Sequence, residues 1–446
     1  MWTSAAAILA FGFANNQWKV ADDKWFQTYQ LDTESLIVGR LAKSQQDGIF
    51  SEGGLTGRSK QQGADDTYQQ QYLLYTKNLP IYKFARYESQ IGFQAMLFGL
   101  ADKLTDFTND ENLAVFKMLT SILTAVTVTA IIFWFLDQFG IFAGIVVFVS
   151  TLLSQWMVVF GRTLWWVIWA FYIPILVSFG VLNHEDRVGR YSNKKAGLLL
   201  FTAVFIKCLF NGYEYITTTL IMMVTPYIYY GIRDKWGFRK LSFRIIAAGA
   251  SGLAAVLASM VILVLQLSSV RGGLIYGVKH IIYSFGKRTY GNPDLYPEIY
   301  KVSLQADTFS VLGSYFKGTW CNLGKVFFTD SSIWPHFELK LRYGQIILLY
   351  FIFTVIGVGL LYSHAAQIKK HHDRLLALIG ATWFSMLAPL SWFIIFKGHS
   401  YLHKHINFIT WHMPFMFFGF ALAGYVMGLS VLILKARIID RYRSTD

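Results

Sequence analysis

The sequence has little charge for its length. Only 15% of its 446 residues are charged, whereas 54% are hydrophobic and 17% are aromatic. A soluble domain of this apolarity would have to bury more residues than its surface-to-volume ratio allows. Several apolar runs approach the roughly 20 residues that cross a bilayer. Composition therefore excludes an ordinary soluble protein and predicts an all-α fold, a polytopic bundle of transmembrane helices.

Cysteines and nucleotide-binding motifs are also scarce. The two cysteines are Cys208, inside an apolar run, and Cys321, in a polar stretch, so we expect no structural disulfide. The chain lacks a P-loop, and "RGGLIYG" does not stand between a strand and a helix, as a dinucleotide-binding fingerprint would. We therefore do not expect a nucleotide-sugar donor.

Acidic residues are outnumbered by basic ones. The chain has 26 Asp and Glu against 40 Lys and Arg, which gives a net charge of +14. In a membrane protein, Lys and Arg gather on the cytoplasmic loops and set the orientation. This explanation accounts for the excess without a nucleic-acid partner, and we expect none.

The apolar runs predict ten spans. The first is a short helix in "MWTSAAAILAFGFANN", which lacks the basic region of a cleaved signal peptide. The other nine lie near residues 112–136, 141–160, 164–182, 196–211, 214–231, 243–267, 344–362, 375–396 and 409–434.

Four basic segments orient these spans. They surround residues 187–195, 233–244, 369–374 and 435–443, and with ten spans all four fall on one side. That side is predicted to be cytoplasmic, together with both termini. The other side then carries a long first loop, 15–111, and a second large loop, 268–343. Residues 84–104 are predicted to form an amphipathic helix along the interface. The chain thus divides into an N-terminal module (1–267), the large loop (268–343) and C-terminal helices with a tail (344–446).

Four stretches on the predicted outer side are distinctive: "SQQDGIFSEGGLTG", "FGRTLWWVIWAFYIP", "IKCLFNGYEYITT" and "FKGHSYLHKHINFITWHMPF". With a long acid-bearing loop after the first helix, they make the chain resemble the GT-C glycosyltransferases, and in particular uncharacterised bacterial members of that superfamily. The resemblance implies a GT-C-like fold and a polyprenyl-phosphate-linked sugar donor. It also implies a multi-pass protein of the bacterial inner, or plasma, membrane.

Asp47 is the candidate catalytic base. Sugar transfer to a hydroxyl needs a base near the attacking oxygen, and an outward carboxylate at the membrane surface suits that role. The alternative is that Asp47-Gly48 only forms a turn. Many GT-C members carry two adjacent acids in this loop, whereas here the next acid is Glu52 and the adjacent pair is Asp65-Asp66. Glu52, Asp65 and Asp66 therefore remain alternatives.

Cations near the outer face are candidate phosphate ligands. Arg162 lies between two apolar spans, where a charge is costly unless it is paired or used. Lys207, Tyr213 and Glu214 surround "CLFNGYEY", with a predicted helix break at Asn211-Gly212. Lys207 would bind phosphate and Glu214 a sugar hydroxyl, or the two would pair with each other.

The last candidate cluster follows the pattern H-x3-H-x-H. It consists of Lys397, His399, His403, His405 and Asn407, with Lys404 beside them. Two histidines four residues apart could bind zinc, but no acid lies nearby and the lysines repel a cation. The cluster therefore favours a phosphate or pyrophosphate head group over a metal site, and an ordinary interfacial loop is the alternative.

These observations predict a membrane glycosyltransferase of the cell envelope. Its partners would be a polyprenyl-phosphate sugar donor, a glycan or lipid-linked acceptor, and membrane lipids. No cofactor is required by the sequence, and a divalent cation is left open. The alternatives are a transporter or flippase of a lipid-linked sugar and a glycan polymer ligase; the absence of an internal repeat disfavours a transporter.

Overall fold

The computed structural model describes residues 1–60, 67–323 and 339–443, with side chains up to residue 439. Asp65 and Asp66, two of the alternative acids, lie outside the described residues. Helices account for most of the described chain, and two short two-stranded sheets account for its strands. The predicted all-α class is therefore confirmed for this part of the chain.

The elements follow in four groups. The first contains α1 (Trp2–Asn15), α2 (Asp23–Trp25), the π-helix η1 (Phe26–Gln30), α3 (Leu31–Asp47), the 3-10 helix η2 (Ser51–Gly54), β1 (Gly57–Lys60), α4 (Tyr68–Thr76), β2 (Lys83–Arg86) and α5 (Phe93–Leu104). The second contains α6 (Asn109–Phe139), α7 (Ile141–Leu153), α8 (Gln155–Gly161), α9 (Ile168–Val188), α10 (Asn193–Asn211), α11 (Ile216–Arg233) and α12 (Phe238–Arg271).

The third group contains α13 (Leu274–Gly286), η3 (Pro293–Leu295), α14 (Glu298–Gln305), α15 (Thr308–Lys317), β3 (Thr319–Asn322) and β4 (Lys340–Arg342). The fourth contains α17 (Tyr343–Ser363), η4 (Lys369–His371), α18 (His372–Ser385), α19 (Leu387–Ile395), α20 (Lys397–Leu402), α21 (Lys404–Asn407), η5 (Phe408–His412) and α22 (Phe415–Arg443).

Six stretches of helix in the described chain are long and apolar enough to cross a membrane, and a bent pair makes a seventh if it is one span. The six are Asn109–Phe139, Ile168–Val188, Phe238–Arg271, Tyr343–Ser363, Lys369–Ile395 and Phe415–Ile439; the pair is α7 with α8, bent by 69°. Each predicted span overlaps helix, although residues 164–167 precede α9. However, α1 has only 14 residues, and α10 and α11 are not among the six. A multi-pass bundle is therefore supported, and the count of ten stays a prediction.

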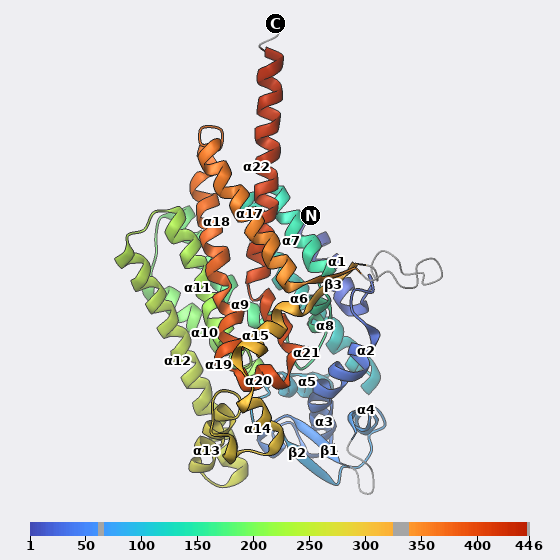
Figure 1. Ribbon diagram of the computed structural model, residues 1–446. Coiled ribbons are helices and arrows are strands. Elements are labelled where there is room, and N and C mark those ends of the chain that lie inside the picture. The colour runs from blue at the N-terminus through green and yellow to red at the C-terminus, as the bar shows by residue number, and fades with distance from the viewer. Residues whose placement is uncertain (61–66, 324–338, 444–446) are drawn as a thin grey trace.

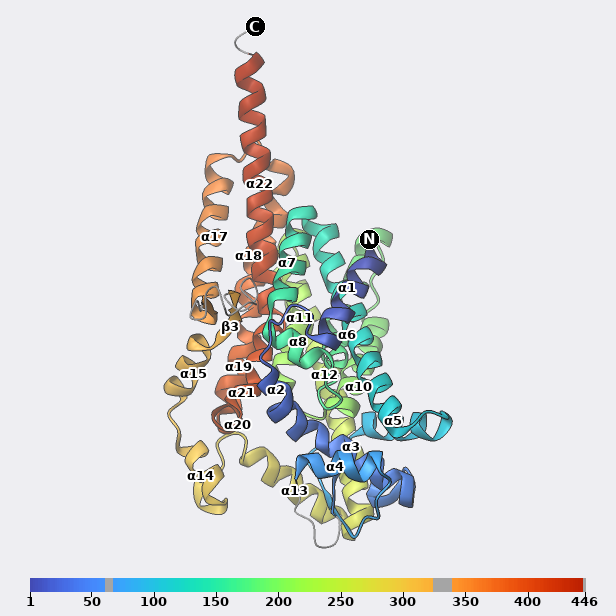
Figure 2. The ribbon, with the colours of Figure 1, turned by 90° about the vertical axis from the view of Figure 1, so that its right-hand side faces the viewer.

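The long helices run between two ends of different character (Figure 1). We call one the loop end; it carries the first loop, with α3, α4, α5 and the β1–β2 sheet, as well as α13 and α14. We call the other the basic end; there α9 ends, α12 begins, and α22 projects beyond its neighbours (Figure 2). Lys235 contacts Asp373 there at 2.9 Å, and Arg244 contacts Glu185 at 2.7 Å. Basic segments far apart in sequence thus meet at one end, as the charge pattern predicts.

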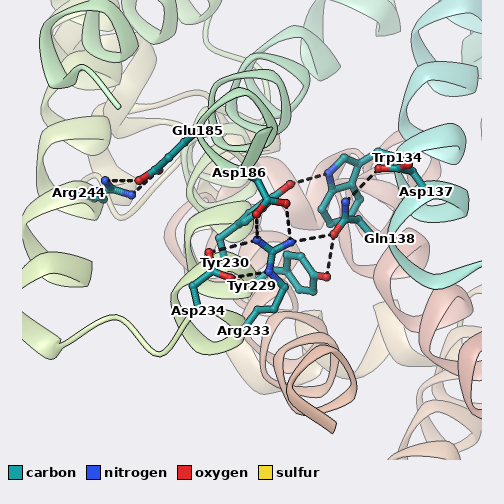
Figure 3. A network of polar contacts seen from close by, with 10 residues as sticks. All are labelled: Trp134, Asp137, Gln138, Glu185, Asp186, Tyr229, Tyr230, Arg233, Asp234 and Arg244. Atoms are coloured by element: carbon teal, nitrogen blue, oxygen red, sulfur yellow. Dashed lines mark hydrogen bonds and ion pairs between the residues drawn. The ribbon is translucent and has the colours of Figure 1, made fainter. Parts of the chain in front are cut away.

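The basic end is held by a closed polar network, which we call the basic-end cluster (Figure 3). The Arg233 guanidinium donates to Asp186 at 2.7 Å, to Asp234 at 2.6 Å and to Gln138 Oε1 at 3.1 Å. Gln138 Oε1 also accepts from the Tyr229 hydroxyl at 3.1 Å. The cluster therefore ties together the ends of α6, α9 and α11.

The first loop at the loop end is folded. Strands β1 and β2 pair antiparallel, with Gly57 opposite Arg86. The predicted amphipathic helix 84–104 is wrong in its first half, because residues 83–86 form β2 and helix α5 begins only at Phe93. Its second half is helical and leaves Leu97, Leu100 and Leu104 exposed. Figure 2 shows α5 lying across the direction of the long helices.

Candidate functional site

A pocket opens at the loop end between helices that are distant in sequence. It encloses about 700 Å³ of space, including its opening to solvent. One wall is apolar and comes mostly from α12, α13 and α19. The polar wall comes mostly from segment 87–90, from the α10–α11 connection and from α13. The polar residues that line it are Tyr87, Glu88, Ser89, Gln90, Tyr213, Glu214, His280, Ser284 and Arg288. We call it the loop-end pocket.

Glu214 reaches the pocket because the chain breaks where the sequence predicts a break. Helix α10 ends at Asn211, and Gly212 and Tyr215 adopt positive φ angles of 53° and 51°. A Cβ on Gly212 would lie 2.5 Å from Gln90 Cβ, so the turn needs glycine there. The turn is fixed from beneath by Lys207, whose Nζ donates to the carbonyls of Gly212 at 2.8 Å and Glu214 at 2.6 Å.

Lys207 is therefore not a pocket residue. Its side chain is fully buried, and its ammonium group donates to two backbone carbonyls, including that of Glu214, rather than to the Glu214 carboxylate. Its contacts are the two carbonyls and the face of Phe171, 5.1 Å away. Lys207 shapes the turn that presents Tyr213 and Glu214.

The Glu214 carboxylate is nearly buried and lightly partnered. Its Oε2 lies 3.5 Å from His399 Nε2 and has no hydrogen-bond partner. Three further polar atoms of the lining are buried without a partner, Gln90 Nε2, the Tyr213 hydroxyl oxygen and Trp392 Nε1. Buried polar groups are nearly always hydrogen-bonded. Several unpartnered polar atoms around one pocket are expected at a site that binds a polar ligand.

His399 lies behind Glu214 and is neutral. Burial, with the nearby Arg288 and other cations, holds its pKa well below the ordinary value for histidine. Asn407 Nδ2 lies 3.4 Å from His399 Nδ1, and His399 Nε2 is the ring nitrogen that faces Glu214. Asn407 and His399, two of the predicted site residues, thus lie behind a third, Glu214.

His403 and His405 continue this row away from the pocket. The rings of His399 and His403 are 4.6 Å apart, and burial lowers the pKa of His403 to about 3. His405 stacks on Tyr29 at 4.2 Å. Lys397 is turned elsewhere, because its Nζ donates to the Leu304 carbonyl at 2.7 Å. Burial therefore favours the neutral form of these histidines, and the cationic part of the predicted cluster is confined to its lysines.

Glu88 supplies the second carboxylate of the pocket. It accepts hydrogen bonds from Tyr276 at 2.7 Å and Arg271 at 2.8 Å, and His280 Nδ1 lies 3.6 Å away. Burial raises its pKa, but the bonds from Tyr276 and Arg271 outweigh burial and hold the pKa below its usual range. Glu88 is thus a fixed anion that joins the first loop to α12 and α13.

Arg288 is the cation that faces this pocket with the most free donor capacity. Its one described side-chain hydrogen bond goes from Nη2 to the Tyr87 hydroxyl at 3.3 Å. A guanidinium has five N–H donors in a fixed fork that fits phosphate. Most of these donors remain for a ligand.

The two predicted catalytic acids do not line the pocket. Asp47 ends α3, is about half exposed and pairs with Lys43 one turn earlier. Glu52 pairs with Arg86 at 2.5 Å. The loop between them is held by the buried Arg40, which donates to the carbonyls of Gly48, Ile49 and Ser51. Burial lowers the pKa of Arg40 to about 10. Arg86 connects this loop to the pocket, because it also contacts Glu88 at 3.5 Å.

Arg162 belongs to a different buried centre. It donates to Gln30 Oε1 at 3.2 Å and to the Ala14 carbonyl at 3.0 Å, and it stacks on Phe26. Gln30 in turn donates to the fully buried Glu34, which Lys117 contacts at 3.1 Å. Arg162 therefore fastens α1, η1 and α8 together and does not reach the loop-end pocket.

Four important residues escaped the sequence-based prediction: Glu34, Glu88, His280 and Arg288. No spacing or motif marks them, since their partners come from elements up to 201 residues away, as in the bond from Arg288 to Tyr87. Arg162 was selected because a charge between apolar spans is costly unless it is paired or used. The same reasoning applies to Glu34, but the sequence alone does not show that Glu34 is buried.

The described residues include no group of three or more His, Cys, Asp or Glu side chains that could hold a metal ion. Cys208 and Cys321 are both free and buried, as expected for separated cysteines. Comparisons with protein-family models, with characterised proteins and with solved structures found no match to this chain.

Proposed function

We propose that this protein is a membrane glycosyltransferase. It transfers a monosaccharide from a polyprenyl-phosphate carrier to a hydroxyl of a cell-surface glycan or lipid-linked acceptor. One observation carries the proposal: the loop-end pocket joins an apolar wall, from a helix long enough to span a bilayer, to two carboxylates and an arginine with free donors. A ligand that is part lipid, part phosphate and part sugar matches that combination.

The pocket residues take complementary roles in this reaction. The acceptor hydroxyl oxygen attacks the anomeric carbon, and its proton passes to Glu214, whose Oε2 is free to receive it. The bond between the anomeric carbon and the phosphate oxygen breaks, and the electron pair leaves with the phosphate. Arg288 neutralises that leaving charge. Trp392, with its unpartnered indole N–H, offers a flat surface for the sugar ring.

This assignment moves the base from Asp47 to Glu214. The resemblance to the GT-C superfamily, with its implied fold, favours Asp47, whereas the geometry favours Glu214, because Asp47 pairs with Lys43 outside the pocket. We further propose that the loop end faces the outside of a bacterial cytoplasmic membrane, that both termini are cytoplasmic and that all ten helical segments cross. The gathering of Lys and Arg at the basic end supports this orientation.

The test is formation of a glycosidic bond by purified protein in proteoliposomes, with polyprenyl-phosphate sugars as donors. We expect Glu214→Gln to lower transfer by roughly 10²- to 10⁴-fold, the usual contribution of a general base, while donor binding persists. Arg288→Met should instead weaken donor binding. Asp47→Asn is the control and should transfer at close to the wild-type rate.

Three outcomes would contradict the proposal in different ways. An inactive Asp47→Asn protein beside an active Glu214→Gln protein would return the base to the first loop. Movement of the lipid-linked sugar across the bilayer without a new glycosidic bond would favour a transporter. Transfer restricted to long glycan donors would favour a polymer ligase.

A further inference from the structure

Helix α13 folds back against α12 instead of leaving the bundle. It follows α12 after a two-residue turn, Gly272-Gly273, in which Gly272 has a φ of 79°. A Cβ on Gly277 would lie 2.9 Å from the Val264 carbonyl oxygen and 3.1 Å from its Cα, so the two backbones are in close contact. Gly277 therefore lies beside a residue seven positions before the end of α12.

Val264 lies within the apolar run of α12. Val264 is flanked by Val261 and Leu265, which are 59% and 56% exposed. α12 is one of the helices long and apolar enough to span a membrane, and side chains of this kind on such a helix face lipid. Contact at Val264 brings α13 back to the edge of the same apolar zone.

The two faces of α13 differ. His280, Ile281 and Ser284 line the loop-end pocket. The opposite face exposes Ile275 at 71% and Ile282 at 66%, and Leu274 and Val278 are exposed beside it. Soluble surfaces rarely carry so many large apolar side chains on one short helix. This face needs an apolar cover, and no described element of the chain supplies one.

We propose that α13 is embedded in the outer lipid leaflet, with its exposed face against acyl chains and its other face closing the pocket. Continuity with the lipid-facing side of α12 identifies lipid as the cover. Lys279 lies on the exposed face between Ile275 and Ile282, and a lysine can extend its ammonium to lipid phosphates. α13 therefore lies at the boundary between head groups and acyl chains, as interfacial amphipathic helices do. The inference rests on helix packing and does not depend on the proposed reaction.

Site-directed spin labelling of the full chain in proteoliposomes tests this placement. Both native cysteines are buried, so labels report on introduced ones. The variants are Ile275→Cys and Ile282→Cys on α13, with Val261→Cys as the lipid reference and Asp294→Cys, a mostly exposed site in η3, as the water reference. Collisions with oxygen report lipid, and collisions with a water-soluble nickel complex report solvent.

We expect labels at 275 and 282 to favour oxygen over nickel, as at 261 and unlike 294. Nickel accessibility at 275 and 282 equal to that at 294 would place α13 in water and overturn the proposal. Low accessibility to both reagents, with dipolar broadening between labels, would show that a second copy of the chain covers this face, which also overturns it.

Discussion

The two ends of the helical bundle treat their buried polar side chains in opposite ways. In the basic-end cluster the Arg233 guanidinium meets two carboxylates and an amide oxygen, and Gln138 is bonded through both ends of its amide (Figure 3). In the loop-end pocket, Gln90 Nε2, Trp392 Nε1 and Glu214 Oε2 are buried without hydrogen bonds. The described residues have other unpartnered buried atoms, such as Thr124 Oγ1 and Thr129 Oγ1 of α6, but none belongs to the basic-end cluster. Several of them line the loop-end pocket, where a polar ligand would complete them.

Acid should loosen the loop end through His399 and His403. In both rings burial holds the folded-state pKa below the unfolded value of about 6.5, and for His403 it is about 3. The unfolded chain therefore binds more protons, and stability falls as the pH drops below about 6.5. The loss is at most about 1.4 kcal/mol per pH unit for each ring. Thermal unfolding in nanodiscs between pH 7.5 and 4.5 measures it.

His403→Gln should flatten this pH profile, because the variant removes one of the two buried rings. His184→Gln is the control, since His184 is exposed at the basic end and its ring keeps its water contacts in both states. An unchanged slope in His403→Gln would mean that this ring already takes up its proton in the folded protein.

Arg233→Met should destabilise the protein without altering the loop-end pocket. The change leaves Asp186, Asp234 and Gln138 without their shared donor. A fully buried pair would lose 3–5 kcal/mol, but both carboxylates are about 35–40% exposed, so we expect about 2 kcal/mol. The midpoint of chemical unfolding in detergent measures this loss.

Lys235→Met is the matched control for the same substitution. Lys235 also pairs with a carboxylate, Asp373, but its side chain is 73% exposed. Exposed pairs contribute about 0–1 kcal/mol, so the expected loss is smaller than that of Arg233→Met. Equal losses in the two variants would show that the cluster is no more than a set of surface ion pairs.

The sequence predicted the framework of the molecule better than its site. Apolar runs placed nearly every long helix, because a bilayer demands about 20 apolar residues whatever the fold. The break at Asn211-Gly212 was also readable, since glycine marks a turn by its local freedom. The positions of Asp47 and Arg162 were not readable in this way. Whether a charge faces a pocket or a partner depends on long-range packing, and Arg162 found Gln30 and Ala14. Glu88 and Arg288 carry no local signal for the same reason.

The amphipathic pattern over residues 84–104 shows a second limit of prediction from sequence. Its spacing fits a helix, yet residues 83–86 pair with β1. A four-residue window cannot distinguish a helix from a strand when tertiary pairing supplies the hydrogen bonds. Only the stretch from Phe93, where the apolar pattern continues without a competing strand, became helix α5.

Two buried glutamines, one at each end of the bundle, test whether the two ends differ in how they satisfy buried polar groups. The change in stability expected for one of them, Gln90→Met, is the smallest of those predicted. Gln90 lines the pocket at 3% exposure with an unpartnered Nε2, and Gln138 lies in the basic-end cluster at 6% exposure with both amide atoms bonded. Replacement by methionine keeps the size and removes the amide. Gln138→Met should cost about 1–2 kcal/mol, because it removes the acceptor that Tyr229 and Arg233 share and leaves Arg233 with its two carboxylates alone. Gln90→Met should be neutral or slightly stabilising, because no bond is lost and an unsatisfied group disappears.

The two variants should also differ in ligand binding, and here Gln90→Met should have the larger effect. Gln90→Met removes a donor that faces the pocket and should weaken the binding of a lipid-phosphate sugar, whereas Gln138→Met should leave binding unchanged in the folded protein. A loss of stability in Gln90→Met as large as that in Gln138→Met would show that its amide is satisfied by ordered water. The pocket would then be a hydrated cavity that serves the fold, since water bound there would stabilise the empty protein as a partner side chain does.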